Sequence, residues 1–535
     1  MRFLTSKPQS EQAETVGPPA SKEKVTFVAC FMGLVASIGG FMFGYVSGQI
    51  SGYFNMKDYA RRFGDSSLDD SDTAFSAVRQ GTITGLLAAG CLVGALIAGK
   101  LADTLGRRMA ISVSALWASV GIVIEISSQT AWYQFAIGRL VTGFSIGALS
   151  VVVPMYQSES SPTIIRGILV STYQLFITLG IWTSYLVDFG TANINNSASW
   201  RIPDGIGFAW SLILGVGILF LPESPRYAYT KGRTDEARHT IARLAGVDEN
   251  DPLVNNQITQ IRVKLEEEAS QGKASWSEIF TGPRMLHRTV LGIVLQAGQQ
   301  LTGANFFFYY GTTIFKATGL SDSYVTQIIL GSVNVVCTFA GLYVVHKVGR
   351  RKALMSGAGW IFICFLIYAF VGQFALDSTN PQNTPAAGSA LIVFSALAIA
   401  AFATTWGPIV WAAVAEMYPT RYRAPCMALA TASNWFWNFL ISFFTRFITD
   451  EIHYWYGLVF AGCCLVLVFV VFFFMIETKD RSLEEIDTMY LLHVNPRHSS
   501  KWDGSKVPED SLPSSRNGHG QEQELKQELK DQPTV

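Results

Sequence analysis

Apolar residues of this 535-residue chain gather in long runs that are separated by short polar breaks. Each run is close to the ~20 residues that a helix needs to cross the hydrocarbon core of a bilayer. We count twelve runs, near residues 25–48, 79–99, 109–128, 131–154, 167–188, 205–221, 289–311, 325–345, 353–376, 388–415, 426–448 and 455–476. A soluble protein with twelve such runs would have no surface left for water. The pattern predicts an all-α membrane protein with twelve transmembrane helices.

The polar segments divide the chain into five parts. We expect a cytoplasmic tail (1–24), a six-helix bundle (25–221), a cytoplasmic linker (222–288), a second six-helix bundle (289–476) and a mostly disordered cytoplasmic tail (477–535). In the linker, Asp251-Pro252 is typical of a helix N-cap followed by proline at the first helical position. The stretch from Thr234 to Leu244 is amphipathic. The linker therefore holds two or three short cytoplasmic helices.

Charge changes the picture through its position. Lysine plus arginine equals aspartate plus glutamate, 40 each, so no net charge points to nucleic acid. Basic clusters follow the second, eighth and tenth runs: Lys100, Arg107 and Arg108; Lys347, Arg350, Arg351 and Lys352; Arg421 and Arg423. Cytoplasmic loops carry an excess of such residues. The pattern thus places these loops, the linker and both termini in the cytoplasm.

The two bundles repeat their motifs. Gly106-Arg107-Arg108 returns as Gly349-Arg350-Arg351, and the pattern E-x-x-P-T-x-x-R begins at both Glu159 and Glu416. Two matching motifs after matching spans indicate duplicated six-helix halves. Such halves form a substrate site at their interface, near the middle of the membrane, and rock to open each side in turn.

Acidic and basic residues recur at the cytoplasmic helix ends. We expect them to pair between helices and latch the inner side shut. The alternative is that they only set the orientation of the chain in the membrane, which would explain the arginines and leave the glutamates unexplained. The latch residues are Asp103, Arg107, Glu159, Arg166, Glu223, Arg226, Arg350, Glu416 and Arg423.

Amide side chains lie inside the apolar runs, where an unpaired amide is costly. A sugar is an uncharged ring of hydroxyls, and an amide both donates and accepts hydrogen bonds. The alternative for each single amide is a hydrogen bond that joins helices. The amides are Gln174, Gln299, Gln300, Asn305, Asn334, Asn434 and Asn438.

Together these motifs resemble the sugar porter family of the major facilitator superfamily, and the span from Phe43 to Gly52 is most similar to hexose transporters of filamentous fungi. The resemblance rests on Gly138-Arg139, Pro222-Glu223-Ser224-Pro225-Arg226, Gln299-Gln300 with Gly303 and Asn305, Trp406-Gly407-Pro408 and Asn434-Trp435. It implies hexose transport at the plasma membrane. It also implies sugar binding by Gln174, Gln299, Gln300, Asn305, Asn334 and Asn434, with Trp411 beneath the ring, an outer gate at Tyr309 and Tyr310, and a bend at Gly407-Pro408.

The sequence departs from that family at two informative places. Proton-coupled members carry an acid at the position of Val46, which pairs with the arginine that matches Arg139. Because valine cannot exchange a proton, we expect facilitated diffusion, with a proton-coupled symporter as the alternative. Glu125 is a candidate partner for Arg139, which is otherwise a structural anchor. Ala403 replaces a glutamate of many glucose facilitators, which leaves the preferred hexose open.

Other functions fit the sequence less well. A sugar sensor would have a longer cytoplasmic tail, and an exporter of apolar compounds would have apolar walls. We find no nucleophile–base set, metal cluster or phosphate loop, so we expect no enzyme activity, cofactor or metal. The expected partners are a sugar and the bilayer, with a monomer as the simplest assembly. Asn195-Asn196-Ser197 is a candidate glycosylation sequon in an outer loop.

Overall fold

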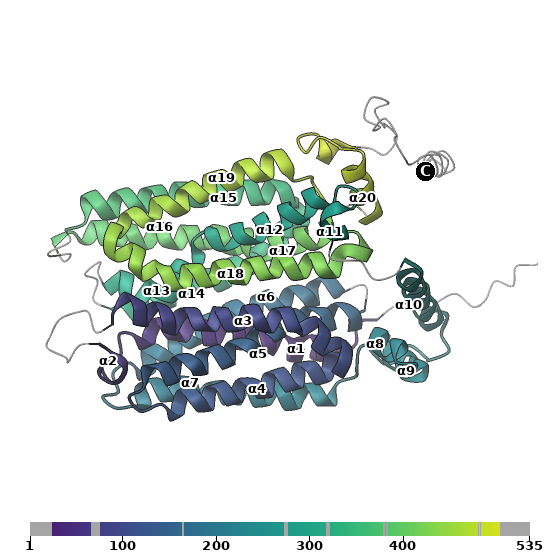
Figure 1. The fold of residues 1–535 in the computed structure, drawn as a ribbon, viewed down its shortest axis with the longest axis horizontal. Coiled ribbons are helices and arrows are strands. Elements are labelled where there is room, and N and C mark those ends of the chain that lie inside the picture. Colours follow the sequence, from purple (N-terminus) through teal and green to yellow (C-terminus); the bar gives the residue numbers. More distant parts are fainter. Residues whose placement is uncertain are drawn as a thin grey trace, which may run out of the picture.

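The computed structural model describes residues 24–502, apart from 66–74, 163–164, 272–276, 317–321, 378–379, 381–382, 480 and 482. Within these ranges every regular element is helical (Figure 1). Residues 1–23 of the first predicted tail and residues 503–535 of the last one lie outside the described part of the chain.

The N-terminal half contains six long helices, each matching one predicted run. The short helix α2 (Lys57–Phe63) follows the first of them. The long helices are α1 (Phe27–Tyr53), α3 (Ala77–Leu105), α4 (Arg107–Ser127), α5 (Trp132–Ser160), α6 (Arg166–Thr191) and α7 (Ala198–Gly217), the last continued by a 3-10 turn, η1 (Ile218–Phe220).

The C-terminal half contains the other six predicted spans, two of which are broken. Its elements are α12 (Met285–Leu301), α13 (Ala304–Lys316), α14 (Ser323–Lys347), α15 (Arg350–Phe370) with a π-helical end, η2 (Val371–Ala375), α16 (Pro385–Thr404), α17 (Trp406–Met417), α18 (Thr420–Ile452), the 3-10 turn η4 (His453–Trp455) and α19 (Tyr456–Phe474). The seventh span breaks between α12 and α13, and the tenth between α16 and α17.

Each break has a local cause. Gly303 adopts φ +80°, and a Cβ there would lie 2.6 Å from the Phe365 ring. Thr405, between α16 and α17, leaves the helical region with φ −129° and ψ −79°. The predicted bend at Gly407-Pro408 is therefore displaced, because the chain turns at Thr405. Pro408 lies in the first turn of α17, where its missing N–H leaves no helical hydrogen bond unmade.

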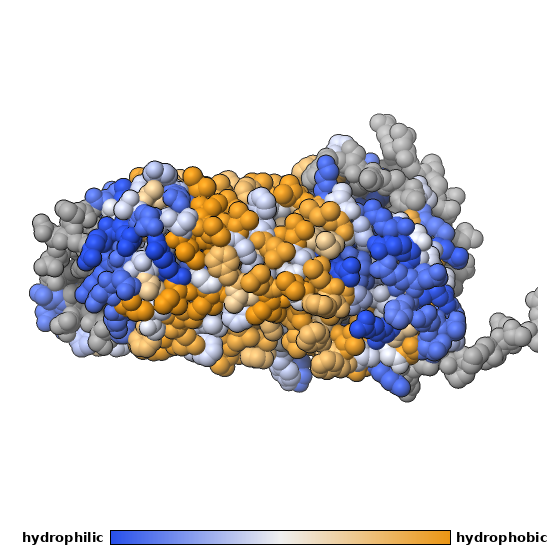
Figure 2. All heavy atoms as spheres, turned by 90° about the horizontal axis from the view of Figure 1, so that it is seen from below, coloured by the Kyte–Doolittle hydropathy of each residue, from blue (hydrophilic) through white to orange (hydrophobic). Residues whose placement is uncertain are grey.

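The apolar surface agrees with a membrane protein of twelve spans. Ten stretches of the described chain are long and apolar enough to cross a membrane, and one of them, Arg421–Phe474, contains both α18 and α19. The seventh span is absent from these ten because its break divides it into two shorter helices. Figure 2 shows a hydrophobic band across the middle of the visible face, with hydrophilic residues gathered at both ends.

The two halves lie side by side, with α3 against α18 and α6 against α14 (Figure 1). Helices α8 (Pro225–Thr230), α9 (Thr234–Ala245) and α10 (Pro252–Gln271) cover one end of the bundle. We call this end the linker face and the end that carries α2 the far face. The described residues of the linker also contain the one-turn helix α11 (Glu278–Thr281), so it holds one helix more than the two or three expected. The predicted start at Asp251-Pro252 is confirmed, because Asp251 accepts a hydrogen bond of 2.8 Å from the Leu253 backbone N–H and α10 begins at Pro252.

One part of the predicted disordered tail is folded. Residues Leu483–Leu491 form α20, and Ile486, Met489 and Tyr490 are buried. Asp487 accepts a hydrogen bond of 2.5 Å from Arg288, whose side chain is fully buried at the start of α12. The expectation of a mostly disordered tail from residue 477 onward is therefore wrong for this helix, which packs against α17 and contacts Arg288 of α12 through Asp487 and Tyr490.

Candidate functional site

Amide side chains of α12, α13 and α18 form one buried, mutually hydrogen-bonded cluster, which we call the amide cluster. Gln300 donates to Asn434 at 2.8 Å, and Asn434 donates to Gln299 at 2.6 Å. Asn305, just after the break at Gly303, donates to Gln300. The sequence analysis therefore identified residues that the fold brings together. It missed Gln296, which accepts a hydrogen bond of 2.9 Å from Asn434 and lies one turn before Gln300 on the same helix.

The predicted gate residues adjoin the far-face side of this cluster. Tyr309 donates to Asn438 at 3.3 Å, and Asn438 donates to Gln300 at 3.4 Å. Tyr310 donates to the Ser442 carbonyl oxygen at 2.5 Å. Both tyrosines thus connect α13 to α18. Asn438 links them to the amide cluster although it was not among the predicted sugar-binding residues.

The remaining predicted sugar-binding residues lie around the cluster. Gln299 donates to the carbonyl oxygens of Trp406 at 3.3 Å and Gly407 at 3.2 Å, so the break before α17 exposes backbone acceptors to the site. Gln174 of α6 points at the same place from the other half, since its amide nitrogen would lie 3.7 Å from a Cβ at Gly407. Trp411 is half-buried one turn farther along α17, and Asn334 is buried on α14.

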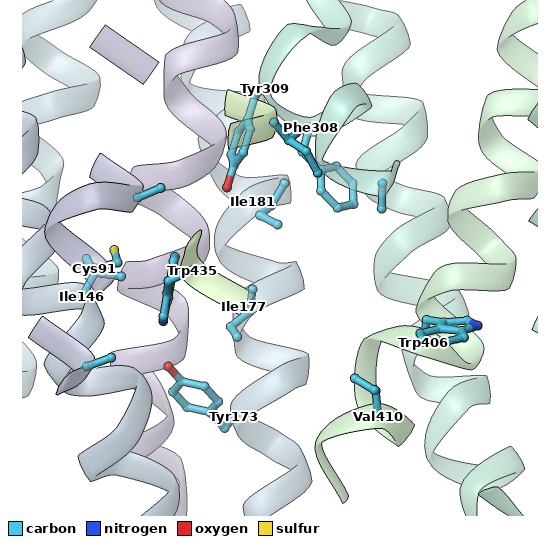
Figure 3. Close-up of a cluster of buried hydrophobic side chains, with 14 of the residues drawn as sticks. Cys91, Ile146, Tyr173, Ile177, Ile181, Phe308, Tyr309, Trp406, Val410 and Trp435 are labelled. Atoms are coloured by element: carbon cyan, nitrogen blue, oxygen red, sulfur yellow. The ribbon is translucent and has the colours of Figure 1, made fainter. Parts of the chain in front are cut away.

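Apolar and aromatic side chains face one another across the interface of the halves. Figure 3 shows Tyr173 and Ile177 on one side, Trp406 and Val410 on the other, and Tyr309 toward one end. Trp435 of α18 packs against Phe43 of α1, with ring centroids 5.2 Å apart. Its indole N–H is buried without a hydrogen-bond partner.

Hydrogen bonds join the two halves on the far-face side of the amide cluster. They connect the ends of α1 and α6 with α13 and α14. The bonds are Gln327 to Ser51 at 2.9 Å, Tyr324 to the Gly52 carbonyl at 2.8 Å, Trp182 to Ser332 at 2.9 Å and Tyr185 to the Phe308 carbonyl at 3.2 Å. The halves are thus fastened to each other toward the far face.

Charged residues at the linker face form the same arrangement in each half. Arg107 pairs with Glu159 at 3.0 Å and with Asp103 at 3.4 Å, and Arg350 pairs with Glu416 at 2.9 Å. These ion pairs join helices within one half, as the latch prediction requires.

Two other predicted latch residues donate hydrogen bonds to main-chain carbonyl oxygens. Arg166 donates to the Ser161 carbonyl at 3.3 Å, and Arg423 donates to the equivalent Tyr418 carbonyl at 3.2 Å. Arg226, half-buried, is the second residue of α8.

A second carboxylate completes each of these arrangements, and only one of the two was predicted. Glu223 accepts a hydrogen bond of 3.1 Å from the Arg107 backbone N–H, and Glu477 accepts the equivalent bond of 2.8 Å from Arg350. The Gly106 and Gly349 that precede these arginines have φ of +93° and +91°, which favours glycine.

Neighbouring hydroxyls repeat as well. Ser224 donates to Glu159 at 2.5 Å, and Thr478 donates to Glu416 at 2.6 Å. The sequence signal was a Glu-Ser after the sixth span and a Glu-Thr after the twelfth. A hydroxyl residue thus follows the carboxylate in both halves.

The arginine left without its usual acid donates to backbone, while its Nε–H is buried without a partner. Arg139 of α5 is fully buried and donates to the Val46 carbonyl oxygen at 2.8 Å. The main chain at Val46 thus supplies an acceptor where the family's acid would supply a carboxylate. Glu125, the predicted partner, is buried nearby and interacts with Arg139 through its charge.

Comparison with known proteins agrees with this geometry. A family profile described as "Sugar (and other) transporter" matches residues 32–490. The chain belongs to the sugar transporter family. Within this family it is 44% identical over 497 residues to the low-affinity glucose transporter HXT1 of Saccharomyces cerevisiae, covering 92% of this chain and 87% of HXT1. It is 43% identical over 516 residues to hexose transporter 2 of Kluyveromyces lactis, covering 96% of this chain and 89% of that protein.

Solved structures confirm the fold of this family member. The proton:xylose symporter XylE bound to 6-bromo-6-deoxy-D-glucose has a TM-score of 0.72 and 22% sequence identity, covering 87% of this chain and all of XylE. An inward-open, partially occluded form of XylE from E. coli has a TM-score of 0.70 over 85% of this chain and all of XylE. The chain therefore has the twelve-helix fold of the major facilitator superfamily.

Proposed function

We propose that this chain carries a hexose such as glucose across the plasma membrane by alternating access and facilitated diffusion. The observation that carries the proposal is the amide cluster, which lies where the two halves meet. The names of its relatives, glucose and hexose transporters, support the substrate class. As a transporter it needs no catalytic group or cofactor.

Sugar binding exchanges the hydrogen bonds within the amide cluster for bonds to hydroxyls. Asn434 hydrogen-bonds with both Gln299 and Gln300. Each amide offers a donor and an acceptor, so a ring of hydroxyls takes over these bonds without leaving a polar group unpaired. Gln174 approaches from the other half, which makes the site sensitive to the relative position of the halves.

The remaining contacts follow from the same geometry. Asn305 adds an amide at the start of α13, and Asn334 adds one from α14. Trp411 packs beneath the apolar face of the sugar ring. Trp435 is a further candidate donor, because its buried indole N–H has no partner of its own.

Gating uses the two broken spans. Tyr309 and Tyr310 sit on the short helix α13, which the break at Gly303 separates from α12. Their hydrogen bonds to α18 hold this helix across the far-face side of the site. Gly407 and Pro408 follow the other break, at Thr405. We propose that α13 moves to admit sugar from outside, and that the turn before α17 flexes when the inner side opens.

The linker-face ion pairs act as the latch. Arg107–Glu159 and Arg350–Glu416 each join two helices of one half, and each arginine also follows a glycine turn fixed by a second carboxylate. We propose that Arg166, Arg226 and Arg423 brace the same turns, and that these contacts hold the inner side shut and break when it opens.

Facilitated diffusion is favoured over symport because the acceptor that α1 offers to Arg139 is the Val46 main-chain carbonyl, which cannot exchange a proton. No titratable group at Val46 exists to exchange a proton as access changes. Proton-coupled symport is the alternative to be tested, since XylE has the same fold and is a symporter.

The linker face is proposed to be cytoplasmic, with both termini on that side, as the basic clusters indicate. Asn195 is then extracellular. It is exposed in the turn between α6 and α7 at the far face, which suits a glycosylation acceptor. One chain supplies the whole amide cluster, so a monomer suffices for transport.

Uptake in a yeast strain that lacks its own hexose transporters tests this function. We expect saturable uptake of labelled glucose that unlabelled hexoses inhibit and a polyol of similar size does not. An inactive control, Gln299→Ala with Gln300→Ala, has to reach the plasma membrane in equal amount. Uptake by that control equal to uptake by the natural chain would contradict a sugar site at the amide cluster.

A further inference from the structure

A second group of buried polar side chains lies inside the N-terminal half, apart from the amide cluster. It consists of Glu125 on α4, Arg139 on α5 and Asp204 on α7. These three residues are 1%, 0% and 2% exposed, in that order. Three ionisable groups so deeply buried must balance their charges, because an unpaired charge in a low-dielectric interior is strongly unfavourable.

Hydrogen bonds satisfy only one oxygen of each of the two carboxyl groups. Thr142 donates to one Glu125 oxygen at 2.7 Å, and Gln49 donates to one Asp204 oxygen at 3.0 Å. The other oxygens, Oε2 of Glu125 and Oδ2 of Asp204, are buried with no donor. Each carboxyl group is thus held at one oxygen and left unsatisfied at the other.

The two carboxyl groups line the same small cavity, together with Gln49 and Thr142. Two carboxylates can only accept, so no hydrogen bond forms between them unless one carries a proton. The charges lead to the same result. With both carboxyls ionised, two negative charges face the single positive charge of Arg139. One added proton brings the sum to zero and supplies the missing donor.

Other groups around the cluster do not supply this balance. In the described part of the chain, Arg139 is the one cation whose charge acts on the two carboxyl groups. Tyrosine and cysteine side chains are ordinarily neutral near pH 7. The remaining titratable groups that face the cluster from α1, α2 and α3 are Tyr45, Tyr53, Tyr59 and Cys91. Asp188 of α6 acts on Tyr45 and Tyr53 and not on the two carboxyl groups, so it does not enter this charge sum.

We propose that Glu125 and Asp204 share one proton, which stays bound in the N-terminal half throughout the transport cycle. All the polar contacts of the pair come from α1, α4, α5 and α7, which belong to one half. Rocking of the halves leaves such surroundings unchanged, so the proton is not released to either side. The site neutralises Arg139 without coupling transport to a proton gradient. Of the experiments that test this proposal, only the measurement of glucose uptake rests on the proposed function.

Infrared difference spectroscopy of the purified full chain tests the shared proton directly. A protonated carboxylic acid has a carbonyl stretching band that a carboxylate lacks. At pH 7 we expect this band to be smaller in both Glu125→Gln and Asp204→Asn than in the natural chain, because the remaining carboxyl then ionises beside Arg139. Comparison with the natural chain cancels any band of the buried Asp188, which both variants keep. Asp235→Asn, which changes an exposed residue of α9, is the matched control and leaves the band unchanged. An undiminished band in both single variants would overturn a shared proton.

Stability and transport supply the second readout. Each single variant keeps the charge sum at zero, so we expect uptake within about twofold of the natural chain. The double variant leaves Arg139 uncompensated and loses about tenfold or more of its folded protein. If one single variant fails to fold, the other decides, because a smaller band is expected from either. Glucose-dependent proton release by the natural chain that disappears in Asp204→Asn would overturn the claim that the proton is resident.

Discussion

Replacing Asn434 by alanine perturbs the amide cluster at its most connected residue. Its Nδ2 donates to Gln299 at 2.6 Å and to Gln296 at 2.9 Å, and its Oδ1 accepts from Gln300 at 2.8 Å. The substitution removes one proposed sugar-binding residue and also releases the glutamines that it orients.

The magnitude follows from these bonds. One neutral hydrogen bond to the sugar is worth about 0.5–1.5 kcal/mol, and a buried glutamine amide left without its partner costs about 1–3 kcal/mol. Because water can enter the vacated space and satisfy part of the loss, we expect a net weakening of about 1.5–3 kcal/mol. That range corresponds to a rise of about tenfold to 150-fold in the KM for glucose.

Labelled glucose uptake in hexose-transport-null yeast measures this KM, with the amount of surface protein measured in the same cells. Ser433→Ala is the matched control. Ser433 is the preceding residue on α18 and donates to the Ile293 carbonyl at 3.1 Å, outside the amide cluster. We expect its KM to stay close to that of the natural chain. A KM for Asn434→Ala within about twofold of the control, at equal surface amount, would refute the reasoning.

Three further predictions concern the linker face and the far face. Gly349→Ala forces a Cβ to within 2.8 Å of Glu477 at φ +91°, and should lower thermal stability by about 1–3 kcal/mol, whereas Gly359→Ala meets open space and should leave the melting temperature unchanged. Glu416 lies 2.9 Å from Arg350, so Glu416→Arg brings two positive charges together and should abolish uptake. Adding Arg350→Glu should restore part of the uptake, and no restoration would argue against direct pairing. Asn195→Gln should increase the electrophoretic mobility of protein from yeast membranes as much as deglycosylation does; an unchanged mobility would exclude glycan at this sequon.

Features that a single helix carries in its own sequence were predictable. The spans, the two halves and the linker follow from apolar runs and basic clusters. The glutamines of the seventh span were recognised because amides are costly inside a membrane helix, and the fold shows them joined to Asn434. Gln296 was missed since one more amide on the same helix does not reveal which way it points.

Features that depend on contacts between distant segments were not predictable. Glu477 was not singled out in the sequence analysis, yet it caps the glycine turn at Gly349, more than a hundred residues earlier. Similarly, α20 folds because it packs against α17 and contacts Arg288 of α12. Asp204 attracted no attention because the neighbour that explains it, Glu125, lies on another helix.

Transport by purified protein in liposomes tests the central claim most directly. The vesicles are loaded without sugar, and labelled glucose is added with and without an imposed inward proton gradient. A facilitator brings internal glucose to the external concentration and no further, with the same end point under both conditions. Accumulation above the external concentration that requires the proton gradient would contradict facilitated diffusion and show that a carboxyl group elsewhere in the chain couples transport to protons.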